Sequence, residues 1–270
     1  GYNVAIGKDA LTQNTTASHN TAVGDSALGS NTTGTECVAV GSATLDANTT
    51  GNCNTGIGMN ALTACTTGGH NTGLGREALK NVTTNSYNTA VGSEALKLNT
   101  AANNSAFGYF ALQQNTTGTS NVAVGKEALK ANTTANNNTA IGFAALYTNT
   151  TGSENTAIGQ AALYYNTTGS RNTGLGQGSV NANTTASDNT GVGHYALTAV
   201  TTGDSNTAVG SKCLDSNTTG SANVVVGYSA LQANTTGSNN VVMGYQALYT
   251  ANIGNTVAIG YKALYANSDT

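Results

Sequence analysis

The chain has 270 residues, with 34 Gly, no Pro, no Trp, only 8% charged residues and a formal net charge of −3. The few charges form no basic patch for nucleic acid, and no apolar run reaches the length of about 18 residues that a membrane helix needs. Asn and Thr take the places that Lys, Glu and Leu fill in ordinary globular domains. The composition therefore excludes a nucleic-acid-binding domain and a membrane span.

One unit of 17 residues repeats along the whole chain. It is clearest in residues 138–154, NTAIGFAALYTNTTGSE, and in residues 155–171, NTAIGQAALYYNTTGSR. If Asn138 is position 1, Gly recurs at position 5 in sixteen units, from Gly7 to Gly260, with a spacing of 17 apart from two steps of 16. Such self-similarity predicts a solenoid. No unit departs enough to divide residues 1–270 into more than one repeat domain.

The predicted elements follow one another in the same order in every unit. Positions 2–4 alternate as β-branched, small and large residues, which predicts a short strand, from residues 4–6 in the first unit to 257–259 in the last. The invariant Gly at position 5 indicates a positive φ or a close backbone approach. Positions 7–10 favour a second extended segment, with a single helical turn as the alternative, and the Asn-Thr-Thr-Gly run at positions 12–15 predicts a turn.

Together these elements predict an all-β fold, a parallel β-solenoid of about sixteen coils of 17 residues, stacked about 4.8 Å apart. All charged residues except Asp269 fall at positions 6, 7, 10, 16 and 17, which we expect to face water. We expect the large apolar residues at positions 2, 4 and 9 to face the core. The Ala and Gly residues at positions 3 and 8 would then pack against another chain, most simply in a trimer.

The first five residues of two units carry a family resemblance. Asn3-Val4-Ala5-Ile6-Gly7 and Thr256-Val257-Ala258-Ile259-Gly260 resemble the N-x-V-A-I-G signature of trimeric autotransporter adhesin heads of the YadA type. The longer NTAVGxxALxxNTTG unit is similar to repeats in phage tail-fibre proteins, which often precede an endosialidase-type chaperone domain. The resemblance covers essentially the whole chain, although the unit is longer than the adhesin repeat by the Asn-Thr-Thr-Gly turn. It implies a left-handed β-roll in a homotrimeric fibre used for surface attachment.

Tyrosines gather at outward positions near the end of the chain. We favour cross-strand stabilisation as the role of this stripe, and recognition of a glycan or a protein receptor is the alternative hypothesis. The residues are Tyr228, Tyr245 and Tyr261 at position 6, and Tyr249 and Tyr265 at position 10.

Asn-Thr-Thr occurs ten times at the predicted turn. Each Asn is formally an acceptor for N-glycosylation, but stacked coils would also place these side chains in a hydrogen-bonded Asn ladder. Both interpretations stay open for Asn14, Asn31, Asn48, Asn115, Asn132, Asn149, Asn166, Asn183, Asn217 and Asn234.

Four cysteines are too few for a disulfide framework in a chain of this length. Cys37 at position 1 and Cys53 at position 17 would lie diagonally on adjoining coils, within reach of a disulfide bond. Cys213 replaces a small residue at position 8 and is expected to be a buried thiol. Cys65 is expected to be a substituted turn Asn.

Catalytic chemistry has little support in the sequence. His19, His70 and His194 fall in positions that keep them apart, so no two can share a metal ion. Glu77 and Glu94 stack in one column beside Lys80 and Lys97, which indicates a solvated charge ladder and not an acid–base pair. We therefore expect no catalytic, metal or cofactor-binding residues, and a protein that is not an enzyme.

The sequence thus predicts a structural fibre outside the cell or on a virion tail, either a phage tail-fibre shaft or an adhesin head. Its expected partners are copies of itself and a cell-surface glycan or protein receptor. The alternative is the subunit of an extracellular, head-to-tail filament, glycosylated or not. Thr270 at position 15 would be followed directly by Gly1 at position 16 of the next copy, so the repeat would continue from one copy to the next. Ice binding is a minor alternative, since the chain is rich in Thr but position 2 is often Val.

Overall fold

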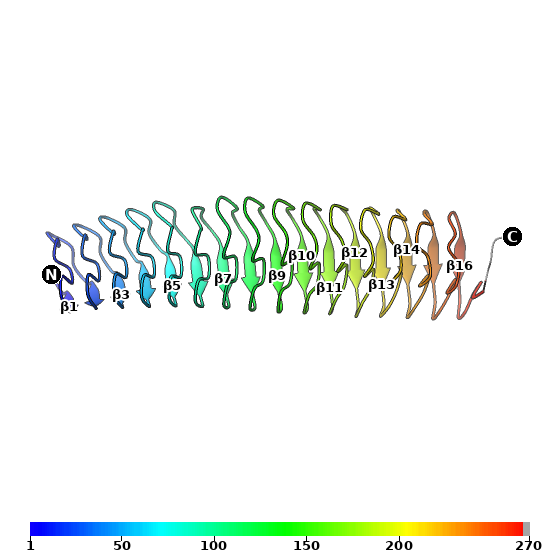
Figure 1. Cartoon of the computed structure of the whole chain (residues 1–270), viewed down its shortest axis with the longest axis horizontal. Helices are drawn as coiled ribbons and strands as arrows, with labels where there is room; N and C mark the ends of the chain where they lie inside the picture. Colours follow the sequence, from blue (N-terminus) through cyan, green and yellow to red (C-terminus); the bar gives the residue numbers. More distant parts are fainter. Residues whose placement is uncertain (267–270) are drawn as a thin grey trace. The chain divides into compact units, whose positions relative to one another are not determined.

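The computed structural model describes residues 1–266, and their only regular elements are sixteen strands of three residues each. The chain divides into two compact units, Gly1–Ala135 and Asn136–Thr270, and each is described by itself. Unit 1 contains β1 (Val4–Ile6), β2 (Thr21–Val23), β3 (Val38–Val40), β4 (Thr55–Ile57), β5 (Thr72–Leu74), β6 (Thr89–Val91), β7 (Ser105–Phe107) and β8 (Val122–Val124). Unit 2 contains β9 (Thr139–Ile141), β10 (Thr156–Ile158), β11 (Thr173–Leu175), β12 (Thr190–Val192), β13 (Thr207–Val209), β14 (Val224–Val226), β15 (Val241–Met243) and β16 (Val257–Ile259) (Figure 1).

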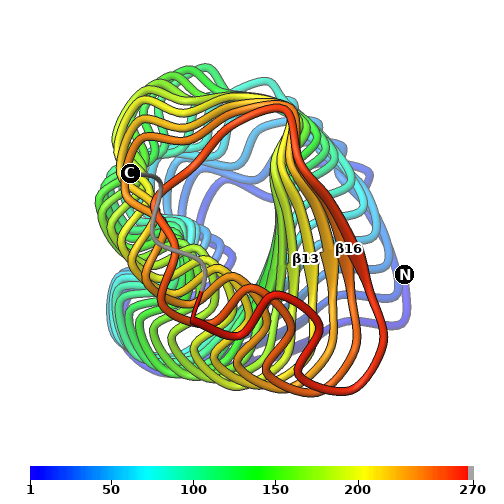
Figure 2. The ribbon, with the colours of Figure 1, turned by 90° about the vertical axis from the view of Figure 1, so that its right-hand side faces the viewer.

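Within each unit every strand pairs in parallel with the next strand along the chain. The register joins equivalent positions of successive coils, as in Val4↔Thr21 of unit 1 and Thr156↔Thr173 of unit 2. Figure 2 shows the strands of unit 2, among them β13 and β16, lining one side of the coil. The predicted strand at positions 2–4 is confirmed in every coil, and so is the all-β parallel solenoid with a 17-residue repeat.

From β2 to β16 the middle residue of each strand faces the interior of the coil, and it is Ala or Gly except for Val225 in β14 and Val242 in β15. In β10 the side chain of Ala157 is fully buried, whereas Thr156 and Ile158 on either side are only half-buried. Ala162 at position 8 and Leu163 at position 9 are also fully buried. Our assignment of positions 2 and 4 to the core, and of positions 3 and 8 to a partner chain, was therefore wrong. The assignment of position 9 to the core is confirmed.

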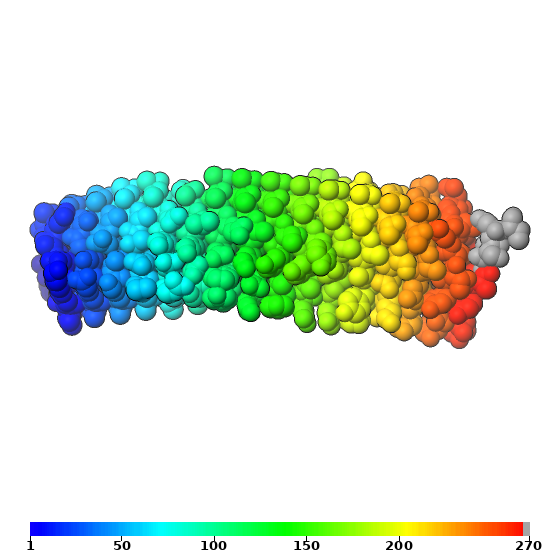
Figure 3. All heavy atoms as spheres, in the orientation of Figure 1, coloured from blue at the N-terminus to red at the C-terminus, as the bar shows by residue number. Residues whose placement is uncertain are grey.

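Close packing against positions 8 and 9 explains why some strands have Gly at the inward position. A Cβ atom on Gly56, at position 3, would lie 2.6 Å from Cγ2 of Thr44. A Cβ atom on Gly191, also at position 3, would lie 2.6 Å from Cγ2 of Val180. Thr44 replaces the usual Ala at position 8, and Val180 replaces the usual Leu at position 9. Each places a methyl group close to position 3, where Gly in place of Ala leaves room for it. The space at the strand differs between coils, because Val225 and Val242 are buried at this same position in β14 and β15. Figure 3 shows successive coils in close contact within each unit on the face drawn.

The Gly at position 5 meets both conditions inferred from the sequence. Gly159 has a φ of 131°, which L-residues rarely adopt, and a Cβ atom on it would lie 2.6 Å from the carbonyl group of Gly176 in the next coil. A side chain here would both strain the backbone and separate the coils.

Positions 6–11 form consecutive turns, so the predicted second extended segment was wrong, and the alternative helical turn was wrong as well. Ala161 and Leu163, at positions 7 and 9, have φ of 53° and 52°, in the left-handed region. This conformation costs an L-residue about 1–2 kcal/mol. It is offset because Leu163 buries its side chain, worth about 1.5–3 kcal/mol, and donates its N–H to the carbonyl of Ser179 in the next coil at 3.0 Å.

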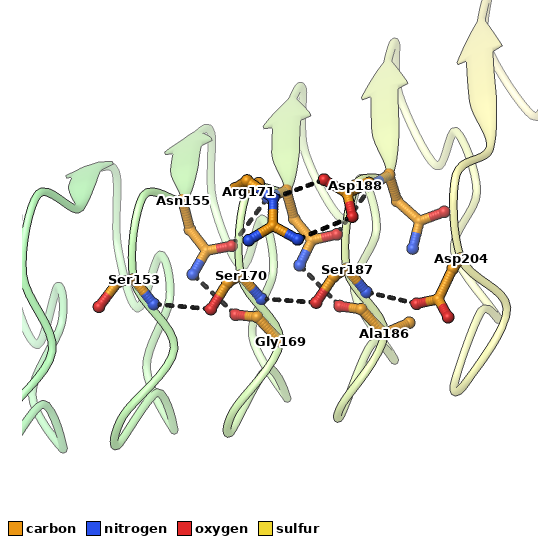
Figure 4. A network of polar contacts seen from close by, with 11 residues as sticks. Ser153, Asn155, Gly169, Ser170, Arg171, Ala186, Ser187, Asp188 and Asp204 are labelled. Carbon is orange, nitrogen blue, oxygen red and sulfur yellow. Dashed lines mark hydrogen bonds and ion pairs between the residues drawn. The ribbon is translucent and has the colours of Figure 1, made fainter.

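Two ladders of Asn side chains run through the interior. At position 1, Asn155 Oδ1 accepts the backbone N–H of Asn172 at 2.9 Å, and its Nδ2 donates to the carbonyl of Gly169 at 2.9 Å (Figure 4). At position 12, Asn166 Nδ2 donates to the same Gly169 carbonyl at 2.9 Å and to Asn149 Oδ1 at 2.8 Å. These side chains are fully buried, so the core is stabilised by satisfied amides as well as by Leu.

The position 12 ladder is interrupted where another residue replaces Asn. In this ladder, buried Oδ1 atoms without a hydrogen-bond partner belong to Asn14, Asn48, Asn183 and Asn234. After the last three, the next coil carries a residue that cannot donate an amide hydrogen, namely Cys65, Val200 or Ala251. Asn14 is followed by Asn31, and the substitutions do not explain its unpaired oxygen. A buried acceptor left unsatisfied costs about 1–3 kcal/mol.

The left-handed residues generate a first prediction. Ala222 is exposed at position 17 with a φ of 55°. We expect Ala222→Gly to raise the free energy of unfolding by roughly 0.5–1 kcal/mol, because Gly tolerates a positive φ. The matched control, Ala233→Gly, changes an equally exposed Ala in a neighbouring turn that lacks a positive φ, and it should lower the same quantity by about 0.5–1 kcal/mol. Denaturant titration measures both, and a loss of stability in both variants would contradict the account.

The interrupted ladder generates a second prediction. Val200→Asn should complete the ladder between Asn183 and Asn217, whereas Val82→Asn lies after Cys65 and has no orphaned amide oxygen to satisfy. Because both changes remove one buried Val, we expect the first variant to be more stable than the second by about 1–3 kcal/mol. Thermal unfolding of the two variants checks this, and equal stabilities would refute the role assigned to the ladder.

Candidate functional site

The side chains at positions 2 and 4 form the outer face of the strands. This outer face carries no charged residue in any of the sixteen coils. Large apolar side chains are exposed on it in both units, for example Ile57 at 40% in β4 and Leu175 at 43% in β11. Since equivalent side chains repeat about every 4.8 Å, they form a continuous apolar strip within each unit. Extended apolar strips of this kind mark interaction surfaces.

The five tyrosines singled out in the sequence form two ladders in unit 2. At position 6, the ring of Tyr245 stacks between Tyr228 and Tyr261, with centroid separations of 5.4 and 5.6 Å and interplanar angles of 12°. At position 10, Tyr249 and Tyr265 stack at 5.2 Å and 4°. The ring faces inside each ladder are covered by neighbouring rings, which supports the stabilising role. Tyr228, Tyr245 and Tyr261 are nonetheless exposed, and the recognition role stays a hypothesis.

A third ladder was missed in the sequence. Tyr147 and Tyr164, both at position 10, stack at 5.1 Å with an interplanar angle of 6°. Tyr165 packs edge-on against Tyr164. The signal was present, because Tyr occupies the same position in two successive units.

The charge ladder at Glu77 and Glu94 is more buried than the sequence suggested. Lys97 Nζ lies 2.7 Å from Glu77 Oε2 and 3.1 Å from Glu94 Oε2, and Lys80 Nζ lies 3.1 Å from Glu77 Oε1. Arg76 pairs with Glu94 on the opposite flank. Each carboxylate side chain is only 12% exposed. Hydrogen bonds from Lys97 and Lys80 lower the pKa of Glu77 to about 2, so the pair is a structural ion cluster and not a proton donor near neutral pH.

A surface hollow of about 450 Å³ lies beside this ion cluster in unit 1. Leu98 and the amide side chains of Gln113 and Gln114 line it, together with Lys97, Thr116 and Thr133. Gln113 Nε2 donates to Glu94 Oε2 at 2.8 Å. One side chain of the hollow therefore contacts the ion cluster directly, and the rest of its lining is both polar and apolar.

The outer polar edge of unit 2 carries a second network (Figure 4). Ser170 Oγ accepts the backbone N–H of Ser153, and Ser187 Oγ accepts that of Ser170, both at 3.1 Å. Beside them Arg171 makes two hydrogen bonds to the carboxylate of Asp188, at 2.7 and 2.9 Å. The guanidinium lowers the pKa of Asp188. Every one of these contacts joins equivalent positions of adjoining coils, so the network stabilises the stack.

The Asn residues of the Asn-Thr-Thr runs face the interior. Nine of the ten are fully buried, and Asn14 is half-buried. The Nδ2 atom that a glycan would occupy instead donates hydrogen bonds, as described for Asn166. The folded coil therefore presents these nine amides as a ladder and not as accessible acceptors.

All four cysteines are free thiols. Cys37 points into the coil, where its Sγ donates to the carbonyl of Gly51 at 3.3 Å, while Cys53 Sγ lies outside and contacts Glu36 Oε2 at 3.4 Å. The candidate disulfide bond between them is not formed, because positions 1 and 17 project to opposite sides of the chain. Burial raises the pKa of Cys37 to about 11 and that of Cys213 to about 12.

The two remaining predictions concern Cys65 and the histidines. Cys65 occupies the interior position of a turn Asn, as expected, and its burial raises its pKa to about 12. His19 stacks on Tyr2, His70 stacks on Tyr87, and His194 lies beside Tyr195. Within residues 1–266, no three His, Cys, Asp or Glu side chains gather closely enough to hold a metal ion. The same residues include no helix with the length and apolarity of a membrane span.

Comparisons of the chain with protein-family models, with curated proteins and with solved structures gave no match. The function must therefore be argued from the geometry of the coil and its surfaces.

The ion cluster predicts a pH dependence. Because the pKa of Glu77 is lowered from 4.5 to about 2, its stabilising effect is fully present above pH 4.5 and is lost as the pH falls toward 2. We expect Glu77→Gln to lower the free energy of unfolding near neutral pH by about 1 kcal/mol. The free energy of unfolding of this variant should also decrease less steeply than that of the wild type as the pH falls from 4.5 to about 2.

Chemical unfolding at a series of pH values measures this effect. Glu154→Gln, which changes an exposed carboxylate in unit 2, serves as the control and should leave the slope unchanged. An unaltered slope in Glu77→Gln would show that the cluster does not couple stability to pH.

Proposed function

We propose that this chain is the shaft of a structural, homo-oligomeric fibre used for surface attachment, either a phage tail-fibre shaft or an adhesin head. It acts outside the cell or on a virion, without enzymatic chemistry or a cofactor. The observation that supports this proposal best is the outer face, an uncharged strip of large side chains on the exposed side of each unit.

A second copy of the chain fits this face better than an unrelated partner. The strip repeats at the spacing of the coils, so side chains of a partner stay in register over many coils only if the partner has the same repeat. A second copy of the chain has the same repeat, so it meets this condition. It also has the same exposed apolar face, which the contact would bury. The trimer follows from the resemblance to adhesin heads, with the contact moved from the Ala columns to the outer face.

Coil 7 supports a packed outer face. Ser105 is the only residue at position 2 that is not Thr or Val, and Phe107 is the only Phe at position 4. The smallest and the largest side chain of the face thus occur side by side in one strand, β7, where Phe107 is 42% exposed in the single chain. Solvent does not require such compensation of volume, whereas a close-packed interface does.

The two alternative functions have less support. The head-to-tail filament rests on the phase of Gly1 and Thr270, and Thr270 lies outside the described residues. Ice binding needs Thr at alternate positions of a flat face. Position 2 is often Thr, but position 4 is never Thr in any of the sixteen coils, so the face lacks the required pair.

A pair of variants in one coil tests the oligomer. Leu175→Lys places a charge on the outer face, and Gln177→Lys places the same charge two residues later, at exposed position 6. An unpaired charge buried in an interface costs several kcal/mol, so the first variant should shift sedimentation velocity from oligomer to monomer by at least tenfold in dissociation constant. The second should sediment as the wild type does.

Two results would contradict the proposal. The first is a wild-type chain that stays monomeric at all concentrations, and the second is equal assembly of both variants while circular dichroism shows both folded. Electron microscopy of the native particle then tests the context, because short discrete fibres on a surface fit the proposal and endless filaments fit the runner-up.

A further inference from the structure

The tyrosine ladders of unit 2 hold phenol rings face to face on adjoining coils. Tyr249 and Tyr265 stack at 5.2 Å and 4°, and Tyr147 and Tyr164 at 5.1 Å and 6°. The small interplanar angles show that the two rings of each pair are nearly parallel, one coil apart. This stacking keeps the two phenols of a pair next to each other.

These rings are also accessible to a reagent. Tyr249, Tyr265, Tyr147 and Tyr164 are partly exposed, and Tyr261 at the end of the position 6 ladder is 73% exposed. They lie at positions 6 and 10, outside the outer face defined by positions 2 and 4.

The other tyrosines provide an internal contrast. Tyr2 and Tyr87 stack on histidines. Tyr195 is exposed, and its ring contact within the described chain is with the ring of His194. A reaction that depends on stacked phenols should therefore distinguish residues of similar exposure within one chain.

We propose that the tyrosine ladders are sites of oxidative cross-linking, at which a one-electron oxidant such as a haem peroxidase with hydrogen peroxide joins stacked tyrosines into dityrosine. Each phenol loses one electron and one proton, and the two phenoxyl radicals couple through one carbon–carbon bond between the ring carbons next to the oxygens. The hydrogens on these two carbons move to the oxygens, which restores both phenols. The pair loses two hydrogen atoms in total, and one hydrogen peroxide takes them up to become two waters.

Such a bond would join adjoining coils covalently. Tyr249 and Tyr265 are 16 residues apart, and Tyr147 and Tyr164 are 17 apart, so each cross-link closes one coil of the solenoid. Closing a loop in the unfolded chain favours the folded state, as a disulfide bond does. The cross-link would thus lock the stack without any disulfide, and it does not depend on the proposed fibre.

The test is to treat the full-length chain with peroxidase and hydrogen peroxide at low protein concentration, and then to measure intact mass and sequence the cross-linked peptides. We expect the monomer to lose two hydrogen atoms for each cross-link, with Tyr249–Tyr265 and Tyr147–Tyr164 among the joined pairs and a raised unfolding temperature. Tyr265→Phe keeps a stacked ring but no phenol, and it should lose only its own cross-link. Tyr195→Phe should lose none.

Three outcomes would overturn the proposal. These are no loss of mass at complete consumption of peroxide, cross-links that form as often through Tyr195 as through the ladders, and dityrosine that joins only separate chains. Circular dichroism of both variants before oxidation ensures that a missing cross-link is not a failure to fold.

Discussion

Each coil relies on the next coil for its hydrogen-bond partners. Strand N–H and C=O groups pair with the neighbouring strand, and the turn N–H of Leu163 is satisfied by Ser179 one coil on. The side chains follow the same rule, as in the Asn ladders and in the Arg171–Asp188 pair. A single coil would leave all these groups unpaired, so stability comes from the interfaces between repeats.

This stacking constraint determines which residues the coil accepts. The close approach of backbones at position 5 admits only Gly, and the interior holds Ala or Gly at position 3 in every coil except those of Val225 and Val242. Stacking also stabilises the left-handed conformations of positions 7, 9 and 17, which would be unfavourable in an isolated peptide. Position 3 faces the interior, beside Leu at position 9 and the buried Asn amides, so the alternation of the strand directs the side chains at positions 2 and 4 outward. The apolar outer face, and with it the proposed oligomer, follows from this orientation of the strand.

Periodicity alone predicted the parts of the fold that every coil repeats. The strand at positions 2–4, the special role of Gly159 and its equivalents, and the stacking of Tyr228, Tyr245 and Tyr261 all follow from the columns. Periodicity could not predict which face of the strand points into the coil. The alternation shows that Thr156 and Ile158 share one face, but it does not show whether that face is inside or outside. Side-chain size suggested the wrong answer, since in ordinary domains the larger apolar residues are the buried ones.

The left-handed backbone of positions 7 and 9 was also not predictable, because Ala and Leu rarely adopt it and it depends on bonds to the next coil.

The central claim is that the Asn side chains are buried in the coil, and hydrogen exchange of their side-chain amides, measured by NMR, tests it most directly. The side-chain NH₂ protons of Asn155 and Asn166 should exchange as slowly as backbone amides of the strands, while those of exposed Asn137 exchange at the rate of a free peptide. Fast exchange of all three would contradict the inward-facing Asn ladders.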